Sequence, residues 1–257
     1  MYIDTHAHLY SDKLIDNIDE LITRSLQSKV NKIFMPNIDL ASISGMHSLA
    51  DKFDKVCYPM MGLHPCSVEK DYKSTLDNMK SYLDSDRNYY GIGETGIDLY
   101  WDISFKKEQI AAFEIQIEWA KIFNLPIIIH SRDSLDLTID MISQYQDGQL
   151  RGIFHCFNGT INQCKKIADN NFYMGLGGVI TYKNAGLNDM VAYMPKEYML
   201  LETDAPYLSP TPMRGKPNES GYLPYVVNKI SEVRNEEIEE VGRYTTANAK
   251  EIFKLKD

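Results

Sequence analysis

The chain has 257 residues, of which 44% are hydrophobic and 25% charged, and its formal net charge is −9. This length is the usual size of a single (β/α)8 barrel, and no apolar run approaches the roughly 18 residues that a membrane span needs. The acidic charge argues against broad binding to duplex nucleic acid, which needs a basic face, but it leaves room for a small cationic pocket or a metal that takes one phosphate at a time.

Eight strand-like apolar runs recur along the chain, at intervals that leave room for a helix between them. Most of these runs are continuous rather than alternating, as is typical of parallel strands covered on both faces. They occupy residues 2–7, 32–38, 56–63, 89–94, 125–130, 152–157, 172–180 and 198–204. The pattern predicts a parallel β-structure with helical connections.

Helical periodicity fills the segments between these runs. Apolar residues recur at three- and four-residue steps over 14–26, where Ser11 is the expected N-cap. The same pattern covers 105–123, and 220–253 is helical with no strand after it. The alternation predicts an α/β fold, a single (β/α)8 TIM barrel over residues 1–257. A doubly wound open sheet is the alternative, although it would not bring side chains together from so many strands.

The remaining features indicate one domain without a leader. The N-terminus opens on a strand rather than on a basic and then apolar segment, so a cytoplasmic location is expected, with no membrane association and no obligate protein partner. The loop 209–224 is expected to lie over the face that carries the site. The four cysteines form no C-x-x-C pair and are expected to be reduced. They are Cys57, Cys66, Cys156 and Cys164.

Six side chains of metal-binding type lie at or near the ends of the apolar runs. Because the carboxyl ends of barrel strands meet at one face, folding brings such residues together. Buried imidazoles without a metal would each need partners for their ring nitrogens. The six residues are His6, His8, Glu94, His130, His155 and Asp204. The sequence therefore predicts a metal-dependent hydrolase.

This ligand set exceeds what one tetrahedral ion uses, which is typically three protein ligands and a water. It suits two ions roughly 4 Å apart. The first two histidines and the aspartate are expected to hold one ion, His130 and His155 the other, and Glu94 would bridge them. Mixed nitrogen and oxygen ligands fit zinc, manganese, magnesium or another divalent ion.

Three carboxylates are candidates for catalysis. Metal-activated water is the expected nucleophile, and Glu94 would hold the two ions in place. Asp204 would hold that water or take its proton. Glu202 lies two residues before Asp204 on the same strand and points the same way. It either orients a ligand or acts in catalysis directly, and both roles remain open.

Three other side chains are candidates for substrate binding. His64 follows the third strand and is expected to bind substrate rather than metal, with capping of the next turn as the alternative. Arg132 and, on the last loop, Arg214 could clamp an anion. Tyr100 and Trp101 follow the fourth strand, where their rings could stack a base or pack between loops.

The motifs together resemble those of the TatD family of metal-dependent deoxyribonucleases, from residue 2 to the segment TTANAKEIF. They are THAH, MGLHP, GIGETGIDLYW, LPIIIHSRDS, FHCFNGT and LLETDAPYLSPTPMRGKPN. The resemblance implies a TIM barrel with a divalent metal centre whose ligands fall on the six residues above. It also implies hydrolysis of phosphodiester bonds in DNA, often from 3′ ends and preferentially in single strands. One departure is Cys66, where family members often have a second histidine.

Two further functions remain open. The same barrel could hydrolyse amides, lactones or aminoacyl esters, because fold does not fix substrate, and the acidic charge favours this alternative. The chain could also be a non-catalytic interaction subunit that kept the fold. The presence of all six ligand residues argues against that last hypothesis.

Overall fold

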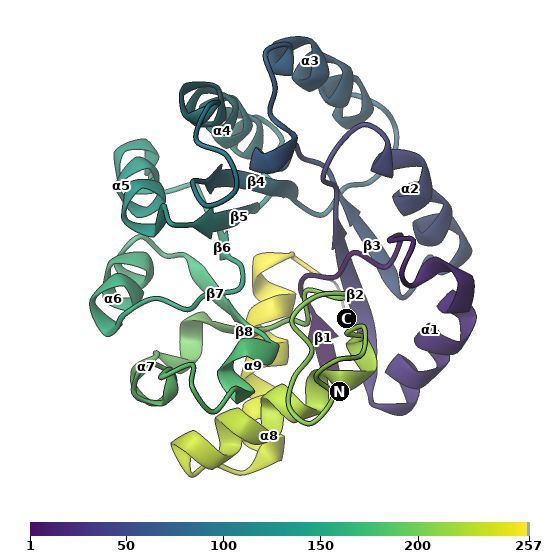
Figure 1. Ribbon diagram of the computed structural model, residues 1–257, viewed down its shortest axis with the longest axis vertical. Helices are drawn as coiled ribbons and strands as arrows, with labels where there is room; N and C mark the ends of the chain where they lie inside the picture. The colour runs from purple at the N-terminus through teal and green to yellow at the C-terminus, as the bar shows by residue number, and fades with distance from the viewer. Residues whose placement is uncertain (256–257) are drawn as a thin grey trace.

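Parallel strands surrounded by helices make up the computed structural model, which describes residues 1–255 (Figure 1). The strands are β1 (Tyr2–Asp4), β2 (Val30–Pro36), β3 (Cys57–Met60), β4 (Ile92–Asp98), β5 (Ile127–Arg132), β6 (Gly152–Phe154), β7 (Tyr173–Leu176) and β8 (Met199–Leu201). The α-helices are α1 (Ile18–Gln27), α2 (Ser42–Lys52), α3 (Tyr72–Leu83), α4 (Lys106–Ile122), α5 (Leu135–Tyr145), α6 (Ile161–Asp169), α7 (Asn188–Tyr193), α8 (Leu223–Arg234) and α9 (Ile238–Ile252). Short 3₁₀ turns are η1 (Ile15–Asn17), η2 (Pro65–Ser67), η3 (Gly178–Thr181), η4 (Lys196–Tyr198) and η5 (Ser220–Tyr222).

Main-chain hydrogen bonds join the strands into a closed ring. The strands pair in chain order in two parts, β1 to β3 and β4 to β8. Between β3 and β4 the Met61 N–H donates to the Gly91 carbonyl at 3.0 Å. Between β8 and β1 the Asp204 N–H donates to the His6 carbonyl at 2.9 Å. Because both gaps are bridged, the predicted TIM barrel is confirmed and the open sheet is excluded.

An apolar layer fills the inside of the barrel. Its side chains come from seven of the eight strands, and they are Ile3, Phe34, Tyr58, Met60, Ile128, Ile153, Tyr173 and Leu200. Helix α9 packs against this layer, and Phe253, directly after the helix, stacks on Phe34 with ring centroids 3.6 Å apart. The amino end of the barrel is therefore covered, and a site can open only at the carboxyl end of the strands.

The spacing of side chains along each strand places polar groups above this layer. Alternate residues of a strand share a face. His130, His155 and Glu202 each follow an interior-layer side chain of β5, β6 or β8 by two positions. They therefore project into the barrel at its carboxyl end.

Every strand differs from its predicted run at one end or both, and β1, β3, β6 and β8 each end three residues earlier than predicted. The differences at the carboxyl end are largest in β4 and β7. Strand β4 was expected to end at Glu94, but residues 95–98 continue the pairing with β5, so the strand ends at Asp98. Glu94 thus lies within the strand. Strand β7 was expected to reach residue 180 but ends at Leu176, because the backbone turns into η3 at Gly178.

The helices largely follow the predicted segments. The segment 105–123 contains α4, and 220–253 contains α8 and α9. The prediction of Ser11 as the first N-cap was wrong, because the turn η1 intervenes and α1 begins after Asn17, whose side chain makes no capping bond. All four cysteines are free. Within residues 1–255, no helix combines the length and apolar character needed to cross a membrane.

Candidate metal centre

Four histidines surround the carboxylate of Glu94. Its Oε2 lies 3.1 Å from His6 Nε2 and 3.2 Å from His8 Nε2. Its Oε1 lies 2.9 Å from His130 Nδ1 and 2.9 Å from His155 Nε2. Each oxygen of this carboxylate faces its own pair of imidazoles. A ligand that bridges two metal-binding positions has this geometry.

Asp204 completes the group on the Oε2 side of Glu94. Its Oδ1 lies 3.5 Å from His8 Nε2 and 3.7 Å from His6 Nε2. Ligand atoms of these three residues lie within 4.8 Å of one another and could hold a metal ion. The structure thus brings together all six side chains that the sequence singled out.

Tyr10 determines which nitrogen of His8 faces the cluster. The Tyr10 hydroxyl donates to the Pro36 carbonyl at 2.6 Å and therefore accepts from His8 Nδ1 at 2.9 Å. With the proton on Nδ1, the Nε2 atom carries a lone pair. In the neutral ring, that lone pair points toward the carboxylates of Glu94 and Asp204. Burial lowers the pKa of His8, but Tyr10 and these two carboxylates raise it well above its ordinary value, so a metal would replace a proton at Nε2.

Asp98 has the same effect on His130. Its Oδ2 accepts from His130 Nε2 at 2.9 Å, so in the neutral ring the Nδ1 lone pair faces Glu94. Metal-binding histidines usually donate their second nitrogen in this way. Burial alone would raise the pKa of Asp98, but hydrogen bonds from His130 and two backbone N–H groups hold it well below its ordinary value. Asp98 was not among the predicted site residues, although its position four residues after Glu94 on one strand face was a usable signal.

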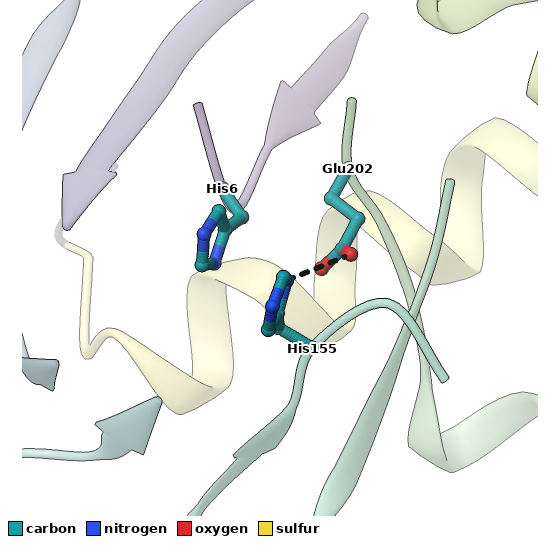
Figure 2. Close-up of side chains that lie close together, drawn as sticks. All are labelled: His6, His155 and Glu202. Atoms are coloured by element: carbon teal, nitrogen blue, oxygen red, sulfur yellow. Dashed lines mark ion pairs between the residues drawn. The ribbon is translucent and has the colours of Figure 1, made fainter. Parts of the chain in front are cut away.

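Glu202 points at His155 (Figure 2). Its Oε1 lies 3.4 Å from His155 Nδ1 and accepts the backbone N–H of Cys156. The His155 ring stacks on that of His6, with centroids 3.9 Å apart and an interplanar angle of 13°. Because Glu202 is fully buried, this geometry favours the orienting role over a direct one in catalysis.

Lone pairs without donors make the cluster suited to cations. His6 Nε2 and His8 Nε2 lie only 3.2 Å apart, and carboxylate oxygens face the same space. Among the described side chains, buried atoms without a hydrogen-bond partner include His6 Nδ1, His155 Nδ1 and Glu202 Oε2. Buried polar atoms left in this state are destabilising. Divalent cations between the converging Nε2 atoms and carboxylate oxygens would satisfy the lone pairs that face one another there, although they would not reach those Nδ1 atoms on the other side of the rings.

The charge states of the two carboxylates suit metal binding. Burial would raise the pKa of Glu94, but the surrounding imidazoles, above all His155, hold that pKa well below its ordinary value. Burial likewise opposes ionisation of Asp204, whose pKa is nevertheless lowered, first by its hydrogen bond with His8. Both groups are therefore anionic near neutral pH. A metal would replace the imidazole protons on binding.

His64 also reaches Glu94, but its hydrogen bonds set it apart from the six. Its Nδ1 accepts the backbone N–H of Cys66 at 3.1 Å, so the proton is on Nε2, which lies 3.4 Å from Glu94 Oε1. A protonated nitrogen donates to anions and does not bind a metal. His64 therefore caps the turn η2, which was one expected alternative. It also presents an N–H toward the cluster, as the other alternative, substrate binding, requires.

A cavity of about 1070 Å³ opens over the cluster. His64 and Arg132 line it, as expected of substrate-binding residues, and Tyr207 and Leu208 form its wall ahead of the loop 209–224. Arg214 does not line this cavity, because its guanidinium group lies over the Tyr182 ring, 4.1 Å from the ring centroid. The structure thus places two of the three predicted substrate-binding residues at the cavity.

Gly175 of β7 leaves the space that Glu202 occupies. A Cβ at Gly175 would overlap Glu202 Oε2, whereas a Cβ at Gly177 would lie 3.4 Å from its nearest neighbour. Gly175→Ala should displace Glu202 and with it His155, lowering metal affinity or activity by roughly 10- to 100-fold. Gly177→Ala is the matched control and should behave like the unchanged protein in a metal titration. Equal behaviour of the two variants would contradict a positioning role for Glu202.

One known family accounts for nearly the whole chain. Residues 3–254 match the family model described as TatD related DNase. The chain belongs to the TatD family of metal-dependent hydrolases. The resemblance seen in the sequence motifs is therefore confirmed.

TatD-family relatives match the chain from end to end. The metal-dependent hydrolase YabD of Bacillus subtilis is 35% identical over 256 residues, which cover 99% of this chain and 100% of that protein. The 3′-5′ ssDNA/RNA exonuclease TatD of Erwinia billingiae is 28% identical, with 98% of each chain covered. The crystal structure of the TatD homologue YjjV from Escherichia coli superposes with a TM-score of 0.93 at 27% identity, covering 99% of this chain and 98% of that one.

Proposed function

We propose that this TatD-family protein is a two-metal phosphodiesterase that shortens single-stranded DNA from its 3′ end. The observation that carries the proposal is the Glu94 carboxylate, with one oxygen toward His6 and His8 and the other toward His130 and His155. Pairs of ions held in this way stabilise the attacking and leaving oxygens of a phosphodiester. The printed name of the Erwinia relative, a ssDNA/RNA exonuclease, supports the substrate class.

The residues divide by the side of Glu94 on which they lie. The two histidines of the segment after β1 would hold one ion together with Asp204. His130 of β5 and His155, which directly follows β6, would hold the other. Mixed nitrogen and oxygen donors are compatible with magnesium, manganese or zinc. When bound, such ions supply a water that is acidic enough to attack near neutral pH.

Asp204 would take the proton of that water. Its side chain is 13% exposed, against 3% for Glu94 and 0% for Glu202, so among these three it has the best access to the cavity. Its lowered pKa keeps it ionised and able to accept a hydrogen bond. A positioned general base of this kind contributes about 10²- to 10⁴-fold to a rate.

His64 and Arg132 would bind the phosphate. His64 presents an N–H on Nε2 beside the cluster. The Arg132 guanidinium is always charged and is placed at the cavity wall, where it can contact a phosphate oxygen. These two donors would hold the substrate anion while the carboxylates hold the ions.

Digestion of a single-stranded oligonucleotide labelled at its 5′ end tests the proposal. Protein reconstituted with magnesium, manganese or zinc should give a ladder of shortening products, and Glu94→Gln should not. The ion that gives the ladder is then the working metal. The acidic charge of −9 favours the competing acyl substrates. An intact oligonucleotide with every metal, beside turnover of lactones or acyl-amino acids, would overturn the proposal in favour of that alternative.

A further inference from the structure

Two exposed aromatic rings lie on the loop that follows β4. Trp101 is 69% exposed and Tyr100 is 54% exposed, so neither ring is held in place by burial. The two rings meet edge to face, with centroids 5.0 Å apart. The Arg132 guanidinium lies 3.8 Å from the Tyr100 ring centroid and 5.3 Å from that of Trp101. Flat rings and a planar cation thus form one accessible surface.

Asp98 connects this surface to the metal centre. Its Oδ1 accepts the backbone N–H of Tyr100 at 2.9 Å and that of Trp101 at 3.2 Å. Its Oδ2 accepts from His130 Nε2 at 2.9 Å. The same carboxylate therefore orients His130 and fixes the start of the aromatic loop. A group stacked on the rings would lie at a defined place relative to the reacting phosphate.

The rings lie where two cavities meet. Trp101 lines the cavity over the metal centre, and Tyr100 lines a second cavity of about 980 Å³ that extends toward the first turns of α5 and α6. Arg132 and Asn158 line both cavities. Each cavity is as large as a typical small-molecule site. A strand whose end reaches the ions can continue past the rings into the second cavity.

We propose that Trp101, Tyr100 and Arg132 form a stacking platform for a nucleobase next to the phosphate that is cut. This inference rests on the proposed nuclease function and names the part of the substrate that the site recognises. Stacking suits a chain with a net charge of −9, because every base has a flat face that an aromatic ring can bind without a basic groove on the protein. Arg132 adds a cation–π contact to the platform. The stacking part of the binding is then tolerant of base sequence.

Tryptophan fluorescence tests the platform without requiring hydrolysis. The chain has two tryptophans, and Trp119 is only 4% exposed, so emission from a Trp119→Phe variant reports on Trp101. A phosphorothioate-linked oligo-deoxyadenylate should quench that emission, and the same backbone without bases should not. Trp101→Phe, which keeps Trp119, should lose the response. Equal quenching by both ligands, or quenching by neither, would overturn the platform.

Steady-state kinetics provides the second test. Trp101→Ala should raise the KM for a base-bearing oligonucleotide by about 10-fold, within the range for loss of one stacked base. In Trp101→Ala, the ratio of the KM for an abasic substrate to the KM for a base-bearing one should fall toward one. Trp101→Phe should keep most of the original ratio. Ile122→Ala truncates an apolar side chain of similar exposure, 67%, at the end of α4 and should leave KM unchanged. A KM that rises equally for both substrates, or does not rise, would contradict the proposal.

Failure of the platform and failure of the nuclease proposal give different results. If the unchanged protein cuts no oligonucleotide but bases still quench Trp101, the hydrolytic proposal is wrong and the nucleobase site stands. If oligonucleotides are cut and Trp101→Ala keeps its KM, the nuclease function stands and the platform is wrong.

Discussion

Replacing Glu94 by glutamine should reduce hydrolysis by roughly 10³-fold or more. Glutamine keeps the shape of the side chain but exchanges one oxygen for an NH₂ group. That group would direct N–H donors at one of the two imidazole pairs, which lie 2.9–3.2 Å from the present oxygens. One ion position would lose the oxygen ligand that Glu94 provides. Metal ions supply several kcal/mol of transition-state stabilisation, and each 1.4 kcal/mol or so is about tenfold in rate.

Metal content and thermal stability give readouts of Glu94→Gln that do not depend on the substrate. Elemental analysis of the loaded protein should show fewer ions per chain than the unchanged protein holds. Metal at about 100 times its dissociation constant stabilises a protein by about 2.7 kcal/mol, which raises the melting temperature by roughly 5–10 °C for a chain of this size. The variant should lose much of that rise. Glu232→Gln, at a side chain 73% exposed on α8, is the control. Full metal content with normal turnover in Glu94→Gln would contradict the shared ligand.

The part of the centre built on strands could be predicted from the sequence. His130 and His155 follow continuous apolar runs, and each lies two residues after a side chain of the interior layer. The two-residue period of a strand then directs both imidazoles inward, and the barrel brings the strand ends together. The pattern of apolar residues along each strand and the closure of the barrel are therefore enough to place these two histidines.

The groups that orient the ligands could not be read from the pattern as easily. The contact of Asp98 with His130 depends on the register between β4 and β5, which is irregular between Ile92 and Thr95. The predicted run 89–94 stops four residues short of Asp98, so only the even spacing from Glu94 pointed to a shared strand face. Long-range register is fixed by packing of the whole barrel rather than by any one segment.

Loop residues were the least predictable. Arg214 follows the last strand, as a substrate-binding residue would, yet it lies on Tyr182 and outside the cavity. Loop conformation depends on contacts of this kind, which sequence spacing does not encode. Tyr100 and Trp101 were open to either packing or stacking, and their exposure favours stacking.

Asp204→Asn should lower kcat by about 10²- to 10⁴-fold while the fold is retained. Asp204 has φ 56°, in the left-handed region that asparagine and aspartate adopt more readily than other side chains, so asparagine adds little strain. The backbone bond to the His6 carbonyl is also kept. What is lost is the negative charge beside His8 and the ability to take a proton. Asp54→Asn, at an exposed turn residue, is the control and should leave kcat unchanged.

The metal content of Asp204→Asn separates its two proposed roles. If both ions stay bound and kcat falls, the lost function is proton transfer, because the amide oxygen still completes the ligand set. If an ion is lost and excess metal restores the rate, the residue acts mainly as a ligand and the proton goes elsewhere. Normal turnover with normal metal content would exclude both roles. Asp204 is the most exposed of the three carboxylates around the cluster, and Glu94 and Glu202 are almost fully buried. After such a result, neither of these two glutamates would be a good candidate for the base.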